Sequence, residues 1–204
     1  MTVSFLEKLA LMGSAARGRR IEDLGERNIP RLLAPLVSAK NGFYAFESAL
    51  HVFPWGGGED SGEWWNADTL WRDGYEGADD GLTFFAEDAF GFQFAVSSVG
   101  FFSFDPETGL REHIANDAEG WAASCIADYV TLTGYPVIHE WQLANGALAP
   151  GLRLAPAIPF FLGGQFSVDG MRGIDAVELM RFRAEIYRQT RDLPDGASVK
   201  IREL

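Results

Sequence analysis

Residues 82–104 read LTFFAEDAFGFQFAVSSVGFFSF, and this stretch decides the fold. It consists of three short runs rich in phenylalanine, separated by Asp88-Ala89 and by Val99-Gly100. Strands this short with connections this tight can only pair as antiparallel neighbours, so the stretch predicts a β-meander. Because strand side chains repeat every two residues, we expect alternate phenylalanines to share a face: Phe92 with Phe94, and Phe102 with Phe104.

Helices and further strands are expected around this meander. Apolar residues recur at helical spacing over residues 4–16, 30–40, 119–132 and 176–192, with shorter helices at 66–72 and 139–144. Further strands are expected at 43–54, 111–114, 160–162 and 199–202, and loops fill most of 55–81. Together these segments indicate an α+β fold, in which an antiparallel sheet is flanked by helices. We expect a single domain over residues 28–204, with an N-terminal helical arm over residues 1–27.

The helix predicted at residues 119–132 has one apolar face. We expect Trp121, Cys125 and Tyr129 on this face to be buried against the sheet. We expect the acidic residues Glu119 and Asp128 to be exposed. Cys125 has no basic neighbour in sequence that would lower its pKa. We therefore expect its thiol to be buried and inert.

The net charge of −12 comes from the middle of the chain. Residues 41–170 hold 19 acidic residues and three basic ones, namely Arg72, Arg111 and Arg153, whereas both ends are mildly basic. All six tryptophans lie in the same region. Affinity for nucleic acid rests on clustered lysine and arginine, so a nucleic-acid partner is disfavoured. An acidic surface rich in aromatic residues favours recognition of a basic protein.

The acidic loops over residues 55–81 are the candidate partner-binding surface. Solvated loops are the commonest explanation for such a run of carboxylates, followed by a partner-facing patch and then by a catalytic or metal site. Two consecutive tryptophans on an extended segment cannot both enter one core, so we expect at least one to be semi-exposed. The candidate residues are Trp64 and Trp65 as anchors, with Glu59, Asp60, Asp79 and Asp80 as a charged rim.

No motif in the sequence specifies a reaction. Residues 139–143 (HEWQL) begin like an HExxH zinc helix, but Leu143 stands where the second histidine is required. The glycines at 56–58 lack the Gly-Lys-Ser/Thr of a phosphate loop, and both the GxSxG elbow and the calcium-loop spacing are absent. We therefore expect no catalytic residue, metal or cofactor. A Ser or Cys nucleophile paired with a histidine, or a carboxylate pair of the glycosidase type, stays open.

The sequence also bears on the compartment. Cys125 is the single cysteine, so no internal disulfide can form, which fits a reducing environment. No run approaches the roughly 20 apolar residues that a membrane helix needs. The apolar stretch near the N-terminus is short and interrupted by Glu7 and Lys8, unlike a signal peptide. We expect a cytoplasmic protein with no membrane partner, and the oligomeric state stays open.

The meander also resembles a known family. Residues 84–88 (FFAED), 90–94 (FGFQF) and 102–109 (FSFDPETG) are similar to the central meander of the SUKH superfamily, the bacterial relatives of the yeast Smi and Knr cell-wall regulators. Asn41-Gly42 and residues 117–129 (DAEGWAASCIADY) match the family's early Asn-Gly and its following helix. The resemblance covers residues 28–134. The chain after residue 134 is expected to be a C-terminal extension, and the N-terminal arm is an addition to the family's core.

This resemblance implies a non-enzymatic binder with an α+β fold. Many bacterial members are immunity proteins that neutralise toxins, often nucleases, by direct binding, and others are adaptors. We therefore expect an immunity protein that binds a basic toxin or effector. The alternatives are a regulatory or structural adaptor and, less favoured, a hydrolase with a cryptic carboxylate or histidine site.

Overall fold

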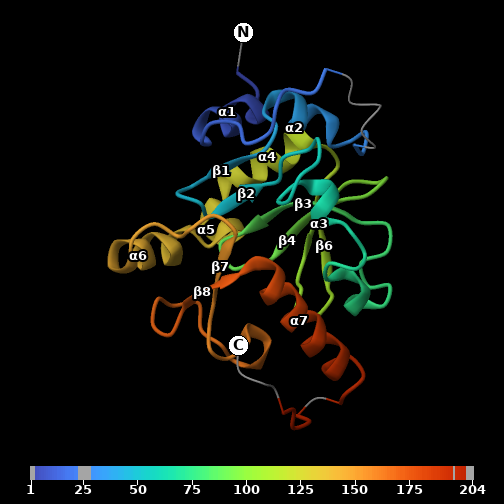
Figure 1. The fold of residues 1–204 in the computed structure, drawn as a ribbon, viewed down its shortest axis with the longest axis vertical. Helices are drawn as coiled ribbons and strands as arrows, with labels where there is room; N and C mark the ends of the chain where they lie inside the picture. The colour runs from blue at the N-terminus through green and yellow to red at the C-terminus, as the bar shows by residue number, and fades with distance from the viewer. Residues whose placement is uncertain (1–2, 23–28, 195, 201–204) are drawn as a thin grey trace.

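A six-stranded antiparallel sheet forms the centre of the protein (Figure 1). The computed structural model describes residues 3–22, 29–194 and 196–200. Strand order follows chain order: β1 (Phe43–Ala45), β2 (Leu50–Val52), β3 (Thr83–Asp88), β4 (Gln93–Val96), β5 (Phe101–Phe104) and β6 (Arg111–Ala115). The predicted meander is therefore confirmed as β3–β5. The expected strand at residues 43–54 is the hairpin β1–β2, which pairs with β3.

One face of the sheet is covered by α1 (Phe5–Met12), α2 (Ala34–Ala39) and α4 (Ala118–Ala127), which lie above it in Figure 1. Ser4 and Glu7 form a capping box that starts α1, and Leu9 of this helix is fully buried. Trp121 of α4 is also fully buried, with its ring centroid 4.9 Å from that of Phe85 and 5.7 Å from that of Phe94. The N-terminal helix thus docks on the body of the protein and shares its core.

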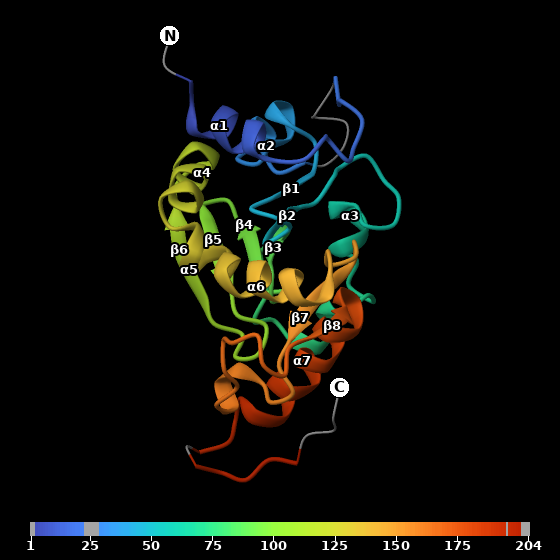
Figure 2. The same cartoon turned by 90° about the vertical axis from the view of Figure 1, so that its left-hand side faces the viewer.

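The opposite face is covered by α3 (Gly62–Trp65), the 3₁₀ helix η2 (Arg72–Tyr75) and α7 (Ala176–Thr190). Figure 1 shows α7 below the sheet, and Figure 2 shows it beside β7 and β8 at the end far from α1 and α2. Phe84 and Phe104 of the sheet pack here against Trp71 and Tyr75. Aromatic residues therefore fill the core on both sides of the sheet.

A third apolar cluster lies beside the sheet. It joins α6 (Tyr135–Asn145), which follows α5 (Tyr129–Thr133), to a small second sheet formed by β7 (Leu152–Ala155) and β8 (Arg172–Asp175). Ile138, Leu154 and Phe90 are buried in this cluster. No strand was expected at β7 or β8, whereas the helices expected at 139–144 and 176–192 are found within α6 and as α7.

Other expected elements differ from the structure. Residues 160–162 are the 3₁₀ helix η3 (Phe160–Leu162) and not a strand, because Pro159 starts a turn that Gly163 ends at positive φ. The short helix lies at α3, where the Ser61 hydroxyl accepts a hydrogen bond from Trp64 N–H, and not at 66–72. Residues 199 and 200 lie in no strand, and 201–202 lie outside the described residues.

The helix predicted at residues 119–132 is broken at Asp128. This residue leaves the helical conformation (φ −134°, ψ 52°) and its carboxylate caps α5 by accepting from Thr131 N–H. Trp121 and Cys125 are buried as expected, but Tyr129 lies beyond the break, is 36% exposed and stacks on Phe46. The prediction that Tyr129 is buried was therefore wrong.

Glu119 also differs from expectation. Its carboxylate accepts hydrogen bonds from the backbone N–H groups of Phe5 (2.5 Å) and Leu6 (3.1 Å), which belong to the first turn of α1. The first N–H groups of a helix have no partner within the helix, and they attract a negative charge. Glu119 is consequently half-buried between two helices, whereas Asp128 is exposed as predicted.

The expected alternation of the phenylalanines is confirmed for β5, whereas Phe92 lies outside β4, so strand geometry does not test its pairing with Phe94. Phe102 and Phe104 both pack on the face covered by α7. Phe92 lies just before β4, and it lines the same cavity as Phe94. Among the described residues, no helix is both long and apolar enough to cross a membrane.

Replacement of Trp121 tests this packing. We expect Trp121→Ala to lower the free energy of unfolding by about 3–5 kcal/mol, because the ring is fully buried among three phenylalanine rings. Urea unfolding followed by circular dichroism measures the change. Leu110→Ala is the control, since Leu110 is exposed and its loss should change stability by less than about 0.5 kcal/mol. Similar losses for both variants would contradict the assigned core.

Candidate functional site

A row of polar residues crosses four neighbouring strands of the sheet. In the strand registers, Tyr44 of β1 lies opposite His51 of β2, His51 lies opposite Glu87 of β3, and Glu87 lies opposite Gln93 of β4. Residues that are directly opposite in antiparallel strands project from the same face. The four side chains therefore lie next to one another on the face that α7 also covers.

Arg153 of β7 completes this row from the second sheet. Its Nε lies 2.8 Å from Glu87 Oε1, and His51 Nδ1 lies 3.1 Å from the same oxygen. All three side chains are almost completely buried. The Trp65 indole N–H donates to Gln93 Oε1 (2.8 Å), which adds a sixth member to the network. Burying a charge is costly unless an opposite charge lies beside it. Glu87 and Arg153 therefore each offset the cost of burying the other.

The charges in this group are balanced. Burial opposes the ionisation of Glu87, but Arg153 and His51 outweigh burial and hold the pKa of this carboxyl below its ordinary value. Burial lowers the pKa of His51, against the effect of its hydrogen bond to Glu87. Near pH 7 the group thus consists of ionised Glu87, charged Arg153 and a neutral His51 whose Nδ1–H donates to Glu87. His51 Nε2 has no hydrogen-bond partner among the described residues.

A cavity of about 310 Å³ opens above the polar row, and we call it the acidic cavity. The walls of the cavity are mainly aromatic and include Tyr44, Phe53, Trp64 and Trp65. Its mouth is mainly acidic, with Glu59 and Asp60. Asp175, at the end of β8, adds a further carboxylate to the lining. The acidic cavity therefore offers aromatic surface and negative charge together.

An arginine of the chain itself already lies at this mouth. Arg17 Nη2 is 2.6 Å from Asp60 Oδ2, and the guanidinium carbon lies 5.1 Å from the centre of the Tyr44 ring. Arg17 is held there by its backbone N–H, which donates to the carbonyl of Gly42. A guanidinium over an aromatic face and beside a carboxylate is the arrangement by which proteins recognise arginine.

The structure brings together only part of the predicted surface. Glu59, Asp60, Trp64 and Trp65 all line the acidic cavity, whereas Asp79 and Asp80 do not. Trp64 is half-buried, which agrees with the expectation that one of the two tryptophans is semi-exposed. Glu59, Asp60 and Asp80 are exposed.

Trp65 and Asp79 do not fit the roles expected for them. Trp65 is 2% exposed, because its ring packs on Phe53 and Trp71 and its N–H is bonded to Gln93. Asp79 is 5% exposed, and its Oδ2 lies 2.6 Å from Nε of Arg72. Trp65 is thus part of the core and Asp79 is the partner of a neighbouring cation, so neither offers a partner a free side chain.

Sequence reasoning missed the residues beneath the cavity. Tyr44, His51, Glu87 and Arg153 come from four separate strands, and no local motif connects them. One signal was present, because Arg153 is one of three basic residues in the acidic middle of the chain. An isolated arginine in such a region indicates a specific carboxylate partner.

Other candidate chemistry from the sequence can also be placed. Within the described residues, no group of three His, Cys, Asp or Glu side chains could hold a metal ion. Burial raises the pKa of the Cys125 thiol well above its usual range, as expected for an inert cysteine. His139 lies on α6, where its Nδ1 is 2.8 Å from Glu47 Oε2. The three glycines at 56–58 are exposed and all have positive φ, which is typical of an open loop.

Comparison with known proteins supports the fold alone. No protein-family profile and no curated protein matches the chain. Among solved structures, the chain is similar to Atu4351 from Agrobacterium tumefaciens, with 14% sequence identity and a TM-score of 0.56. The match covers 88% of this chain and 87% of that one. At this identity the similarity shows a shared fold over most of both chains and nothing about function.

The buried histidine predicts a pH dependence of stability. The pKa of His51 is lowered in the folded protein from about 6.5 in the unfolded chain, so the unfolded chain takes up the proton first. Above pH 6.5 His51 is neutral in both states and does not lower the free energy of unfolding. Below pH 6.5 the unfolded chain gains a proton that buried His51 does not, so the free energy of unfolding falls. We expect His51→Gln, which can still donate to Glu87, to lose less stability than the parent between pH 7 and pH 5.

Thermal unfolding at several pH values measures this difference. Comparison of variant with parent removes the contributions of other titrating groups, because these are common to both proteins. His113→Gln is the matched control, since it makes the same substitution at an exposed histidine outside the buried network. Parallel profiles for His51→Gln and the parent would show that His51 is not buried as a neutral base.

Proposed function

We propose that this chain is a non-enzymatic binding protein that neutralises a basic toxin or effector, as an immunity protein of the SUKH kind does. One observation carries the proposal. The acidic cavity holds Arg17 between Asp60 and the ring of Tyr44, so the site has the chemistry that accepts an arginine side chain. An arginine or lysine of a basic partner would be accommodated at this mouth by the same groups.

Electrostatics supports a basic partner. The chain carries a net charge of −12, and Glu59, Asp60 and Asp80 are exposed on loops of the same acidic region. Complementary charge speeds diffusional encounter and rejects partners of like sign. A toxin that acts on nucleic acid carries a basic substrate-binding surface, and an acidic inhibitor is suited to cover it.

The aromatic wall supports tight binding after encounter. Trp64 is half-buried and lines the cavity next to Asp60, so its ring is fixed in place but still accessible. Binding energy at interfaces concentrates in such anchored aromatic residues, with charged residues at the rim. Trp64 is therefore the anchor of the proposed interface, and Glu59 and Asp60 form its charged rim.

Two other functions use the same residues differently. A regulatory or structural adaptor would bind a partner through this surface without blocking an activity. A hydrolase would need His51 or Glu87 as an acid or base, but the ion pair with Arg153 commits the Glu87 carboxylate to the fold. The geometry therefore favours binding over hydrolysis.

Binding kinetics tests the surface. The first probe is the protein encoded beside this chain, and the variant Glu59→Lys with Asp60→Lys should slow association roughly tenfold at low salt, with a smaller effect at high salt. Glu112→Lys with Glu140→Lys is the matched control, because both residues are exposed, lie outside the acidic cavity and change the charge equally. Equal slowing by both variants would indicate general attraction and contradict a local site.

Trp64→Ala tests the anchor separately. We expect this variant to associate at the parental rate and to dissociate at least tenfold faster, because the buried aromatic contact forms after encounter. Co-expression with the neighbouring protein then tests the role: the parent should relieve its toxicity, and Trp64→Ala should relieve it less. If the neighbouring protein binds this chain but is not toxic, the adaptor is favoured. If the two proteins do not bind, the proposal is contradicted.

A further inference from the structure

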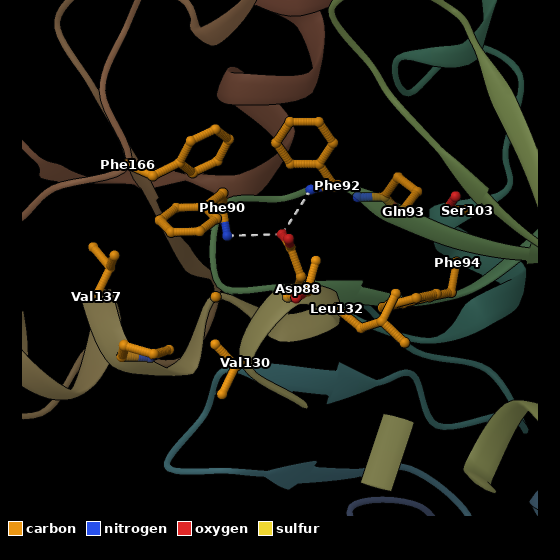
Figure 3. Close-up of a pocket in the computed structure, with 13 residues that line it drawn as sticks. Asp88, Phe90, Phe92, Gln93, Phe94, Ser103, Val130, Leu132, Val137 and Phe166 are labelled. Atoms are coloured by element: carbon orange, nitrogen blue, oxygen red, sulfur yellow. Dashed lines mark hydrogen bonds between the residues drawn. The ribbon is translucent and has the colours of Figure 1, made fainter. Parts of the chain in front are cut away.

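A second cavity, of about 440 Å³, shares no lining residue with the acidic cavity, and we call it the apolar cavity (Figure 3). The turn between β3 and β4 forms one wall and α5 and α6 form another. Its lining is mostly aromatic and aliphatic, including Phe90, Phe92, Phe94, Leu132, Val137 and Phe166. The volume is within the range of about 300–1,000 Å³ that is usual for small-molecule sites.

A carboxyl group lies at the centre of this apolar lining. Asp88, the last residue of β3, is 6% exposed, and Figure 3 shows its side chain among those lining the cavity. Its Oδ1 accepts hydrogen bonds from the backbone N–H groups of Phe90 (2.8 Å) and Phe92 (2.9 Å). The other oxygen, Oδ2, has no hydrogen-bond partner among the residues that the structure describes. Oδ2 is therefore the acceptor that remains open to a hydrogen-bond donor of a ligand in the cavity.

The surroundings leave Asp88 without a protein cation. Among the described residues, no lysine, arginine or histidine lies within ion-pair distance of it, and Arg153 and Arg183 pair with Glu87 and Glu107 instead. Burial raises the pKa of Asp88 to about 7, against the opposing effects of its two backbone hydrogen bonds, of Arg183 from α7 and of Arg153 from β7. A cation that enters the cavity would stabilise the ionised carboxylate.

We propose that the apolar cavity binds a small amine with an apolar body, its ammonium group bonded to Asp88 Oδ2 and its body packed among the phenylalanine rings. Aromatic faces attract cations as well as apolar groups, so the lining suits both halves of such a ligand. A carboxylic acid would meet a like charge at Asp88, and an apolar ligand without a donor would leave Oδ2 unpaired. The residues that line this site are different from those that line the acidic cavity. Either proposal can therefore fail without the other.

The amine 2-(1-naphthyl)ethylamine is the probe, and 2-(1-naphthyl)ethanol is its uncharged match. Calorimetric titration at pH 8 should give binding of the amine that is roughly tenfold tighter than binding of the alcohol, because a charge-assisted hydrogen bond is the stronger one. The alkylammonium stays charged at pH 6, but Asp88 is then mostly protonated, so amine affinity should fall about tenfold while alcohol affinity stays constant. Equal affinity for both compounds, or no binding of the amine, would overturn the proposal.

Two variants locate the site. Asp88→Asn keeps an oxygen that can accept from Phe90 and Phe92, and it should remove both the preference for the amine and its pH dependence. Val130→Trp places a large side chain at an exposed position in the lining and should abolish binding of both compounds. Val99→Trp is the control, since Val99 is also exposed and lies outside the cavity. Should Asp88→Asn fail to fold, the Val130→Trp variant and the pH series decide, and unaltered binding by Val130→Trp would contradict the site.

Discussion

The central sheet carries aromatic side chains on both of its faces, so neither face can be left in water. Phe85, Phe94 and Phe101 project toward α4, while Phe84 and Phe104 project toward η2 and α7. Burial of each such ring stabilises the fold by about 1.5–3 kcal/mol, which makes both covering layers necessary. The order of layers follows from this constraint: α1, α2 and α4 lie on one side, and α3, η2 and α7 lie on the other.

Buried polar groups within such a sheet need a hydrogen-bond partner or an opposite charge. Glu87 and Asp88 are consecutive at the end of β3, and their side chains project to opposite sides because strand residues alternate. Glu87 meets Arg153 and His51 and stays ionised, whereas Asp88 meets two backbone N–H groups and no cation. One pair of neighbouring carboxylates thus supports two different cavities, one lined by acidic loops and one by phenylalanine.

Sequence patterns predicted the parts of the fold that depend on nearby residues. The Phe-rich runs identified β3–β5, and apolar spacing identified α1, most of α4 and α7. The errors occurred where a distant residue decides the outcome. Glu119 is half-buried because it caps α1, and Trp65 is buried because Gln93 accepts its N–H. Of the candidate surface, Glu59, Asp60 and Trp64 are together at a cavity mouth, while Asp79 is taken by Arg72.

By itself the sequence determined the α+β class, the meander, and the acidic and aromatic character of the middle of the chain, because these depend on composition and on spacing along the chain. Only the tertiary structure decided which charged groups are paired. Glu87 meets His51 from 36 positions earlier in the chain and Arg153 from a separate sheet, and Arg17 reaches Asp60 from 43 positions earlier. Such pairings follow from strand register and from the packing of layers, which no local pattern encodes.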